Sequence, residues 1–98
     1  MQASRIYYIE IMKHQLTYHT EDGNFVVNRG VSLKNLEAEL SKAGFCRCSA
    51  CYLVNLRWCS EITSDSVVCG KQHETLKMSR LLKKDFINAL SDFMGRGQ

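Results

Sequence analysis

Residues 32–56 read SLKNLEAELSKAGFCRCSACYLVNL, and the spacing of their apolar side chains changes at Gly44. Before this glycine the apolar positions follow a helical spacing, carried by Leu33, Leu36 and Leu40. Ser32 is a favoured N-cap residue, and a glycine commonly follows the end of a helix. These signals predict a helix of about three turns over residues 32–43, with Ala43 completing its apolar stripe and residues such as Glu37 on its wet side.

After Gly44 the spacing becomes two, because apolar and polar residues alternate over residues 45–49 and 52–56. Two strands are therefore predicted to follow the helix directly. Strands are also predicted before the helix, over residues 5–12, 15–20 and 25–27, since these runs are β-branched and aromatic. Lys13 and His14 separate the first two runs and should form a hairpin tip, while His19 should lie on a strand surface.

The C-terminal half continues with short strands and then a second helix. Short strands are predicted at residues 61–62, 67–69 and 74–79, which turn-forming residues separate from one another. From Ser79 onward the helical spacing returns, through Leu82, Phe86, Leu90 and Phe93. A parallel wrapped fold would need more helices. The pattern predicts a mainly β fold of small antiparallel sheets, with one short internal helix and a C-terminal helix.

Length and composition favour one globular domain over residues 1–98. The chain has 98 residues, 45% of them hydrophobic, and no proline. Its longest apolar runs are four residues, far short of the roughly 20 that a membrane-spanning helix needs. No signal peptide is expected, so we expect a cytoplasmic protein with no membrane partner and with reduced thiols.

The five cysteines admit three interpretations. Cys46, Cys48 and Cys51 resemble a fragment of a zinc site, which Cys59, Cys69 or His73 would have to complete. The same three thiols would also serve as a redox switch. Free cysteine is, however, among the most buried residue types. We therefore expect the cysteines to pack in the core, and we expect no metal and no cofactor.

The sequence gives no catalytic motif and one concentration of positive charge. It contains no nucleophile elbow, phosphate-binding loop, dinucleotide fingerprint or zincin helix, so a non-enzymatic binding module is expected. Residues 71–84 hold five basic side chains and one acidic side chain, a net charge of +4. Such a cluster suits a polyanion, although a solvated surface would look the same.

Taken in order, the segments resemble the LytTR DNA-binding domain, the output module of many bacterial response regulators. The resemblance covers residues 6–93. Its pieces are IYYIE at 6–10, His14, SLKNLE at 32–37, GF-x-RC at 44–48, YLVNL at 52–56, EI at 61–62, MSR at 78–80 and KK-x-F at 83–86. It implies small antiparallel sheets, three in number, stacked in an elongated module. It also implies that loops of the domain enter successive major grooves of promoter DNA. Two copies of the domain would bind paired DNA repeats and bend the DNA.

The resemblance also implies which residues touch DNA. His14 matches a histidine on the first contacting loop, and Arg80 matches an arginine on a second loop. Ala50 falls at a third contacting position, where an alanine cannot donate a hydrogen bond and at most touches a thymine methyl group. Ser49 or Arg47 would then make the base contact in place of Ala50. If Arg47 does not, its family position implies a structural role or a contact with a phosphate. The full expected set is Lys13, His14, Arg47, Ser49, Ala50, Lys77, Arg80, Lys83 and Lys84.

Two further expectations come with the family. Asn55 should be structural, its buried amide bonded to backbone groups. An N-terminal receiver domain is expected in a longer regulator, of which this domain would be the C-terminal fragment. The rival interpretations are a protein-interaction domain that has lost its DNA contacts and a thiol redox switch.

Overall fold

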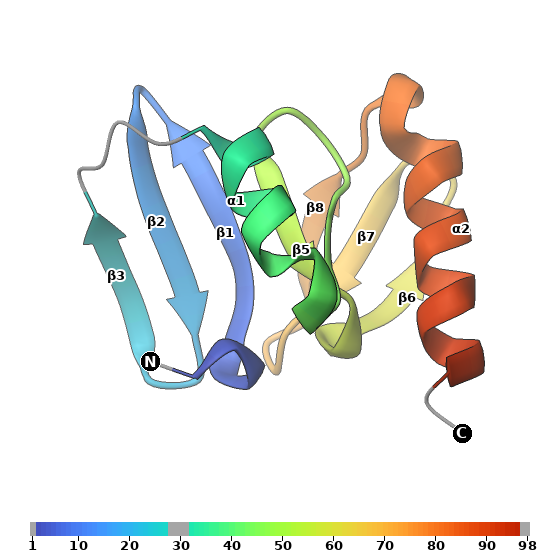
Figure 1. Ribbon diagram of the computed structural model, residues 1–98, viewed down its shortest axis with the longest axis horizontal. Helices are drawn as coiled ribbons and strands as arrows, with labels where there is room; N and C mark the ends of the chain where they lie inside the picture. Colours follow the sequence, from blue (N-terminus) through green and yellow to red (C-terminus); the bar gives the residue numbers. More distant parts are fainter. Residues whose placement is uncertain (1, 28–31, 97–98) are drawn as a thin grey trace.

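The computed structural model describes residues 2–27 and 32–96, and its order of elements is the one expected from the sequence (Figure 1). The strands are β1 (Ile6–Met12), β2 (Gln15–Thr20), β3 (Gly23–Val27), β4 (Phe45–Arg47), β5 (Tyr52–Asn55), β6 (Cys59–Ile62), β7 (Ser66–Cys69) and β8 (Glu74–Lys77). The helices are α1 (Leu33–Leu40) and α2 (Arg80–Arg96), with short 3-10 turns η1 (Ala3–Arg5), η2 (Ser41–Ala43) and η3 (Leu56–Trp58).

Within these residues the strands form two antiparallel sheets rather than three. The larger sheet has the order β3-β2-β1-β5-β4, and the smaller has the order β6-β7-β8. β1 is the joining strand, because Ile9 pairs with Tyr18 of β2 on one side and with Leu53 of β5 on the other. A strand with partners on both edges merges the N-terminal hairpin and the β4–β5 pair into one sheet. The longest dimension of the molecule is 34 Å, against 27 and 25 Å.

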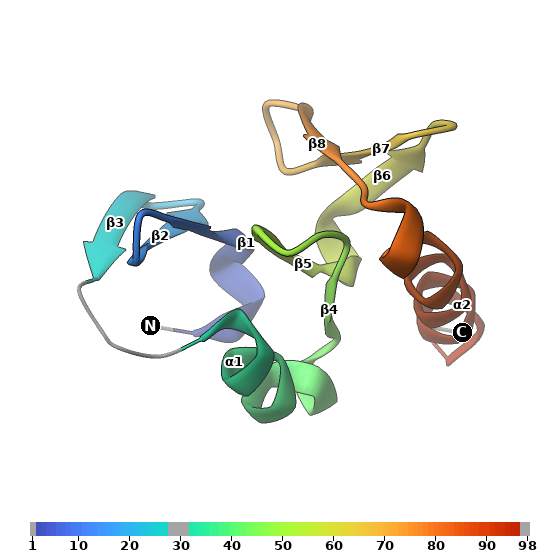
Figure 2. The same ribbon diagram turned by 90° about the horizontal axis from the view of Figure 1, so that it is seen from above.

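Helix α1 covers one face of the larger sheet (Figure 2). Leu33 and Leu36 are buried there against Ile9, Leu16 and Leu53. The Ser32 hydroxyl accepts a hydrogen bond from the Asn35 amide at 3.1 Å, as expected of an N-cap. The last turn tightens into η2, so Ala43 is exposed and does not extend the apolar stripe.

Helix α2 packs on a second core, which joins the two sheets. Phe86 is fully buried together with Val54, Val67, Cys48 and Cys69. Gly44 follows η2, faces Phe93 of α2 and has a φ of +87°. A Cβ on Gly44 would lie 2.8 Å from Cε1 of Phe93, so both the backbone conformation and the close approach of α2 require glycine here.

The buried amide of Asn55 is structural, as expected. Its Nδ2 donates to the carbonyls of Ala3 at 3.2 Å and Ile6 at 2.9 Å, and its Oδ1 accepts from the Arg57 amide at 3.3 Å. One side chain therefore fixes the start of β1 and the first turn of η3. Leaving such buried groups without partners would cost about 1–3 kcal/mol.

The expectation that His19 lies on an exposed strand surface is wrong. Its side chain is only 13% exposed, and its ring stacks on Tyr8 with centroids 4.2 Å apart. Its Nε2 also lies 3.1 Å from Oε1 of Glu10. The reason is that Tyr8 of β1 pairs with His19 across the two strands, so its ring covers the imidazole. The Tyr8 hydroxyl donates in turn to Glu74 of β8 at 2.6 Å. The alternation of residues within one strand did not reveal this stacking.

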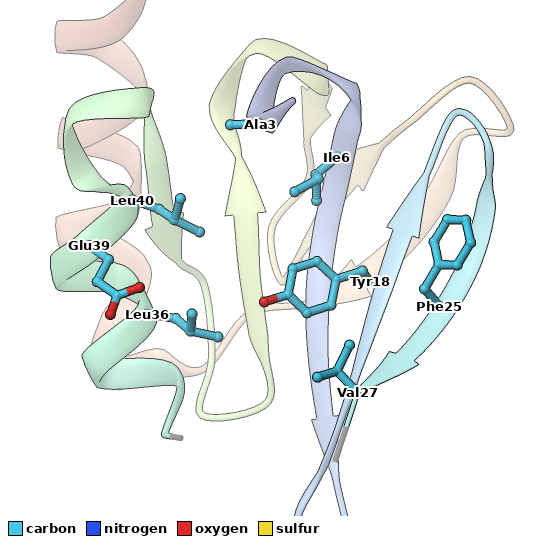
Figure 3. A pocket seen from close by; sticks show the side chains of 8 residues that line it. All are labelled: Ala3, Ile6, Tyr18, Phe25, Val27, Leu36, Glu39 and Leu40. Atoms are coloured by element: carbon cyan, nitrogen blue, oxygen red, sulfur yellow. The ribbon is translucent and has the colours of Figure 1, made fainter. Parts of the chain in front are cut away.

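A groove of about 390 Å³ lies between α1 and the larger sheet (Figure 3). Its walls are mostly apolar, with Tyr18 and Phe25 on the strand side and Leu36 and Leu40 on the helix side. Among the described residues that line it, Glu39 is the one that carries a charge. None of the residues expected to contact DNA lines this groove.

Candidate nucleic-acid interface

The first candidate loop is the tip of the β1–β2 hairpin. Met12 and Gln15 are the closing pair, so Lys13 and His14 form a two-residue turn. Both have positive φ values, 49° and 67°, which is the backbone of a turn that matches the twist of the flanking strands. Both residues are exposed. His14 is therefore presented at the end of a rigid ribbon, as the sequence predicted.

The second candidate loop joins β4 to β5. Cys48 is buried at its start, while Ala50 and Cys51 are exposed. The Ser49 hydroxyl accepts a hydrogen bond from the Cys51 amide at 3.1 Å, which closes the loop on itself. The hydroxyl hydrogen of Ser49 remains available as a donor.

The third candidate loop leads from β8 into α2. The Ser79 hydroxyl accepts from the Leu82 amide at 3.2 Å and caps the helix. Arg80 is the first residue of α2 and is exposed, as are Lys77 at the end of β8 and Lys84 one turn further along α2. The cap fixes the direction in which this basic first turn leaves the sheet.

Backbone hydrogen bonds join the three loops into one edge. The Ile11 amide donates to the Cys51 carbonyl at 2.9 Å, which ties the end of β1 to the β4–β5 loop. The Ser79 amide donates to the Cys48 carbonyl at 2.9 Å, which ties that loop to the start of α2. All three loops lie along the upper edge in Figure 1. Segments 66 residues apart in the sequence, His14 and Arg80, are thereby held on the same edge.

The exposed cations of this edge have no acidic partner. In residues 2–27 and 32–96, no ion pair involves Lys13, Lys77, Arg80 or Lys84. Lys71 was counted with them in the sequence cluster, but it lies in the β7–β8 turn at the opposite end. Its Nζ is 2.8 Å from Oε1 of Glu21 there. The positively charged edge therefore includes fewer of the basic residues at 71–84 than the sequence indicated.

Two of the cations expected to contact DNA, Lys83 and Arg47, make intramolecular contacts through their side chains. The Lys83 ammonium donates to the Ser64 carbonyl, which holds the β6–β7 turn against α2. Nε of Arg47 lies 3.0 Å from Oε1 of Glu37, and the Arg47 amide donates to Oε2 of Glu37 at 2.9 Å. Glu37 is therefore half-buried and bonded rather than on a wet face. Both cations fix the scaffold behind the edge.

The cysteines are free thiols, and most of them pack inside the protein. Burial raises the pKa of Cys46 to about 11 and the pKa values of Cys48 and Cys69 to about 12. Burial also raises the pKa of Cys59. The thiolate is the nucleophile and the metal ligand, and the raised pKa values keep these four thiols in the protonated form at neutral pH. No group of three or more His, Cys, Asp or Glu residues that could hold a metal ion occurs in the described part of the chain.

The structure adds two apolar residues to the edge that the sequence reading did not select. Leu81 follows Arg80 and is 87% exposed, and Met12 precedes Lys13 and is 61% exposed. The sequence did contain a signal for the exposure of Leu81, because this residue is out of phase with the apolar stripe of Leu82 and Phe86.

Among the described residues, no helix is long and apolar enough to cross a bilayer.

Comparisons with known proteins identify the fold and the family. A solved LytTr DNA-binding domain, from a methyl-accepting/DNA response regulator of Bacillus cereus, superposes with a TM-score of 0.75. The match covers 89% of this chain and 82% of that one at 22% sequence identity, which shows a shared fold. No curated protein gives a significant match. The family model of the LytTr DNA-binding domain matches residues 1–91, so the chain belongs to the LytTr DNA-binding domain family.

Proposed function

We propose that this domain binds promoter DNA sequence-specifically and reads two successive major grooves through the loops that carry His14 and Arg80. The observation that carries the proposal is the continuous edge of three hydrogen-bonded loops, whose exposed cations form no ion pair with any acidic residue that the structure describes. Phosphate contacts orient a protein on a duplex, and contacts to base edges supply its specificity. The edge offers both kinds of group.

Each side chain has a role in this proposal. Arg80 binds guanine O6 and N7 with its planar fork, and His14 donates to a base edge or phosphate in the neighbouring groove. Lys13, Lys77 and Lys84 neutralise phosphates. The loop between them offers the Ser49 hydroxyl and the Ala50 methyl group. Arg47 and Lys83 position the edge through their contacts with Glu37 and Ser64.

The wider context is also proposed from the family. The domain acts as the output module of a transcriptional response regulator in the bacterial cytoplasm, with a receiver domain preceding it in a longer chain. Two copies occupy paired DNA repeats. The function is binding rather than catalysis. The rival functions, protein interaction and a thiol switch, are outcomes of the test below.

The test measures affinity for duplex DNA selected from a randomised library and for a scrambled duplex, at about 50 and 200 mM salt. The wild type should prefer the selected duplex, and affinity should fall steeply with salt. Lys77→Ala/Lys84→Ala should reduce the log–log salt slope by roughly 0.9 for each lost phosphate contact. The matched control is Lys42→Ala/Lys71→Ala, which removes the same charge away from the edge and should leave the slope unchanged.

Three results would count against this function. A salt slope near zero would remove the nucleic-acid interpretation and favour protein interaction. Equal slopes for the two double variants would mean that net charge, rather than this edge, attracts DNA. Binding that requires oxidised protein would instead favour the thiol switch.

A further inference from the structure

Leu81 is the most exposed of the five large apolar residues with exposed side chains in the described part of the chain. Single exposed apolar residues are common on protein surfaces, so exposure alone is not informative. Its position is informative, because it follows Arg80 in the first turn of α2. Leu81 and Lys84 are three residues apart and therefore lie on the same side of the helix.

The helix geometry directs Leu81 toward the edge proposed to bind DNA. Side chains of an α-helix tilt toward its N-terminus. The N-terminus of α2 opens on the edge formed by the three loops (Figure 1). The buried stripe of α2 is anchored by Phe86, which leaves Leu81 outside the core. A large apolar group therefore stands between cations on the surface that would meet DNA.

The major groove offers such a side chain one main apolar feature, the 5-methyl group of thymine. Phosphates and the polar atoms of base edges would gain nothing from a leucine. We infer that Leu81 packs against a thymine methyl group next to the base that Arg80 contacts. This inference rests on the proposed function, and it deepens that function by naming thymine as a base that this chain selects. Met12 repeats the arrangement beside His14, at the other contacting loop.

Replacing thymine by deoxyuridine in the DNA tests the inference, since the exchange removes only the methyl group. The probe is the duplex selected by the wild-type domain, with each thymine replaced in turn. At one thymine the replacement should weaken wild-type binding by about fourfold, the factor that corresponds to one buried methyl group. Leu81→Ala should bind the thymine duplex more weakly and should not respond to deoxyuridine at that position. Leu81→Met, which keeps an apolar side chain, should retain the response.

Other outcomes would overturn the inference. It fails if no deoxyuridine replacement affects the wild type, or if Leu81→Ala still responds at the same thymine, since another residue would then read the methyl group. The side chain is almost fully exposed, so Leu81→Ala should unfold at the same denaturant concentration as the wild type. Failure of the proposed function is distinguishable from both results: the selection would enrich no sequence, or Arg80→Ala would bind as the wild type does.

Discussion

The backbone amide of Ser79 donates a 2.9 Å hydrogen bond to the carbonyl of Cys48, across 31 positions of the sequence. Cys48 begins the β4–β5 loop, and Ser79 caps the helix that starts at Arg80. The bond therefore sets the distance between Ala50 and Arg80. A protein that reads DNA through loops needs this kind of fixed spacing, because base edges repeat at fixed intervals along a groove.

Arg80→Ala should relax sequence specificity. Loss of a bidentate guanine contact costs about 1–3 kcal/mol on the selected duplex and much less on a scrambled duplex. His14→Ala should weaken binding through a different position of the site. Because the two loops are separate, the double variant should show the sum of the two losses within about 0.5 kcal/mol. Anisotropy titrations of the three variants against both duplexes measure these values.

The same titrations would also show whether the predicted role of Arg80 is wrong. If Arg80→Ala weakens both duplexes by the same factor, Arg80 contacts only phosphate. If it weakens neither, the interface is elsewhere on the domain.

Lys83 and Lys84 should behave differently although they are neighbours. Lys83→Met removes the hydrogen bond to the Ser64 carbonyl, so the free energy of unfolding should fall by about 0.5–1.5 kcal/mol. Lys84→Met removes an exposed charge without an acidic partner, so it should weaken DNA binding and leave stability unchanged. Urea denaturation of both variants makes the comparison. A stable Lys83→Met protein would show that the β6–β7 turn does not depend on this contact.

Gly44→Ala should destabilise the domain by about 2 kcal/mol, since a side chain at positive φ is strained and its Cβ would meet Phe93. Gly95→Ala is the matched control, because no atom lies within 4 Å of its Cβ position in α2. The control should be neutral or slightly stabilising. Thermal denaturation of both variants measures the two changes in stability. Equal changes would mean that Phe93 and the backbone at Gly44 can shift to accommodate a methyl group.

Stability should decrease above about pH 9. Burial raises the pKa values of Cys48 and Cys69 from 9.0 to about 12, so the unfolded chain releases these thiol protons first. A folded state that keeps protons which the unfolded state has lost becomes less stable as pH rises. Each thiol contributes a slope of up to about 1.4 kcal/mol per pH unit in this window. Tyr8, whose pKa is also raised by burial, adds to the decline above about pH 10.

Urea denaturation between about pH 8 and 10, with a phosphine reductant, measures this slope. Cys69→Val should reduce the slope without removing it, because Cys48 remains. A flat profile for the wild type would show that water reaches these thiols in the folded protein.

Local signals were sufficient for the elements of this fold. The N-cap at Ser32, the turn at Lys13 and His14 and the helix end before Gly44 each depend on a few neighbouring residues, so the sequence predicted them. The family resemblance supplied the candidate edge, since composition and spacing alone left DNA binding as one interpretation among several. It also pointed to Ala50 as a departure from the family pattern.

Long-range contacts decided the rest. Pairing of β1 with both β2 and β5 gave two sheets where three were expected, because the choice of a second partner depends on chain segments far apart in sequence. His19 is covered by the ring of Tyr8, its partner on β1, and the pattern within a single strand does not record that pairing. Lys71 and Lys77 are near neighbours in sequence, but Lys71 lies in the turn before β8 and pairs with Glu21, whereas Lys77 ends β8 and pairs with no acidic residue in the described part of the chain. The sequence determined which groups the domain can offer to DNA, and only tertiary packing decided which of them are free to make contact, because a charge is free only if the fold brings no partner to it.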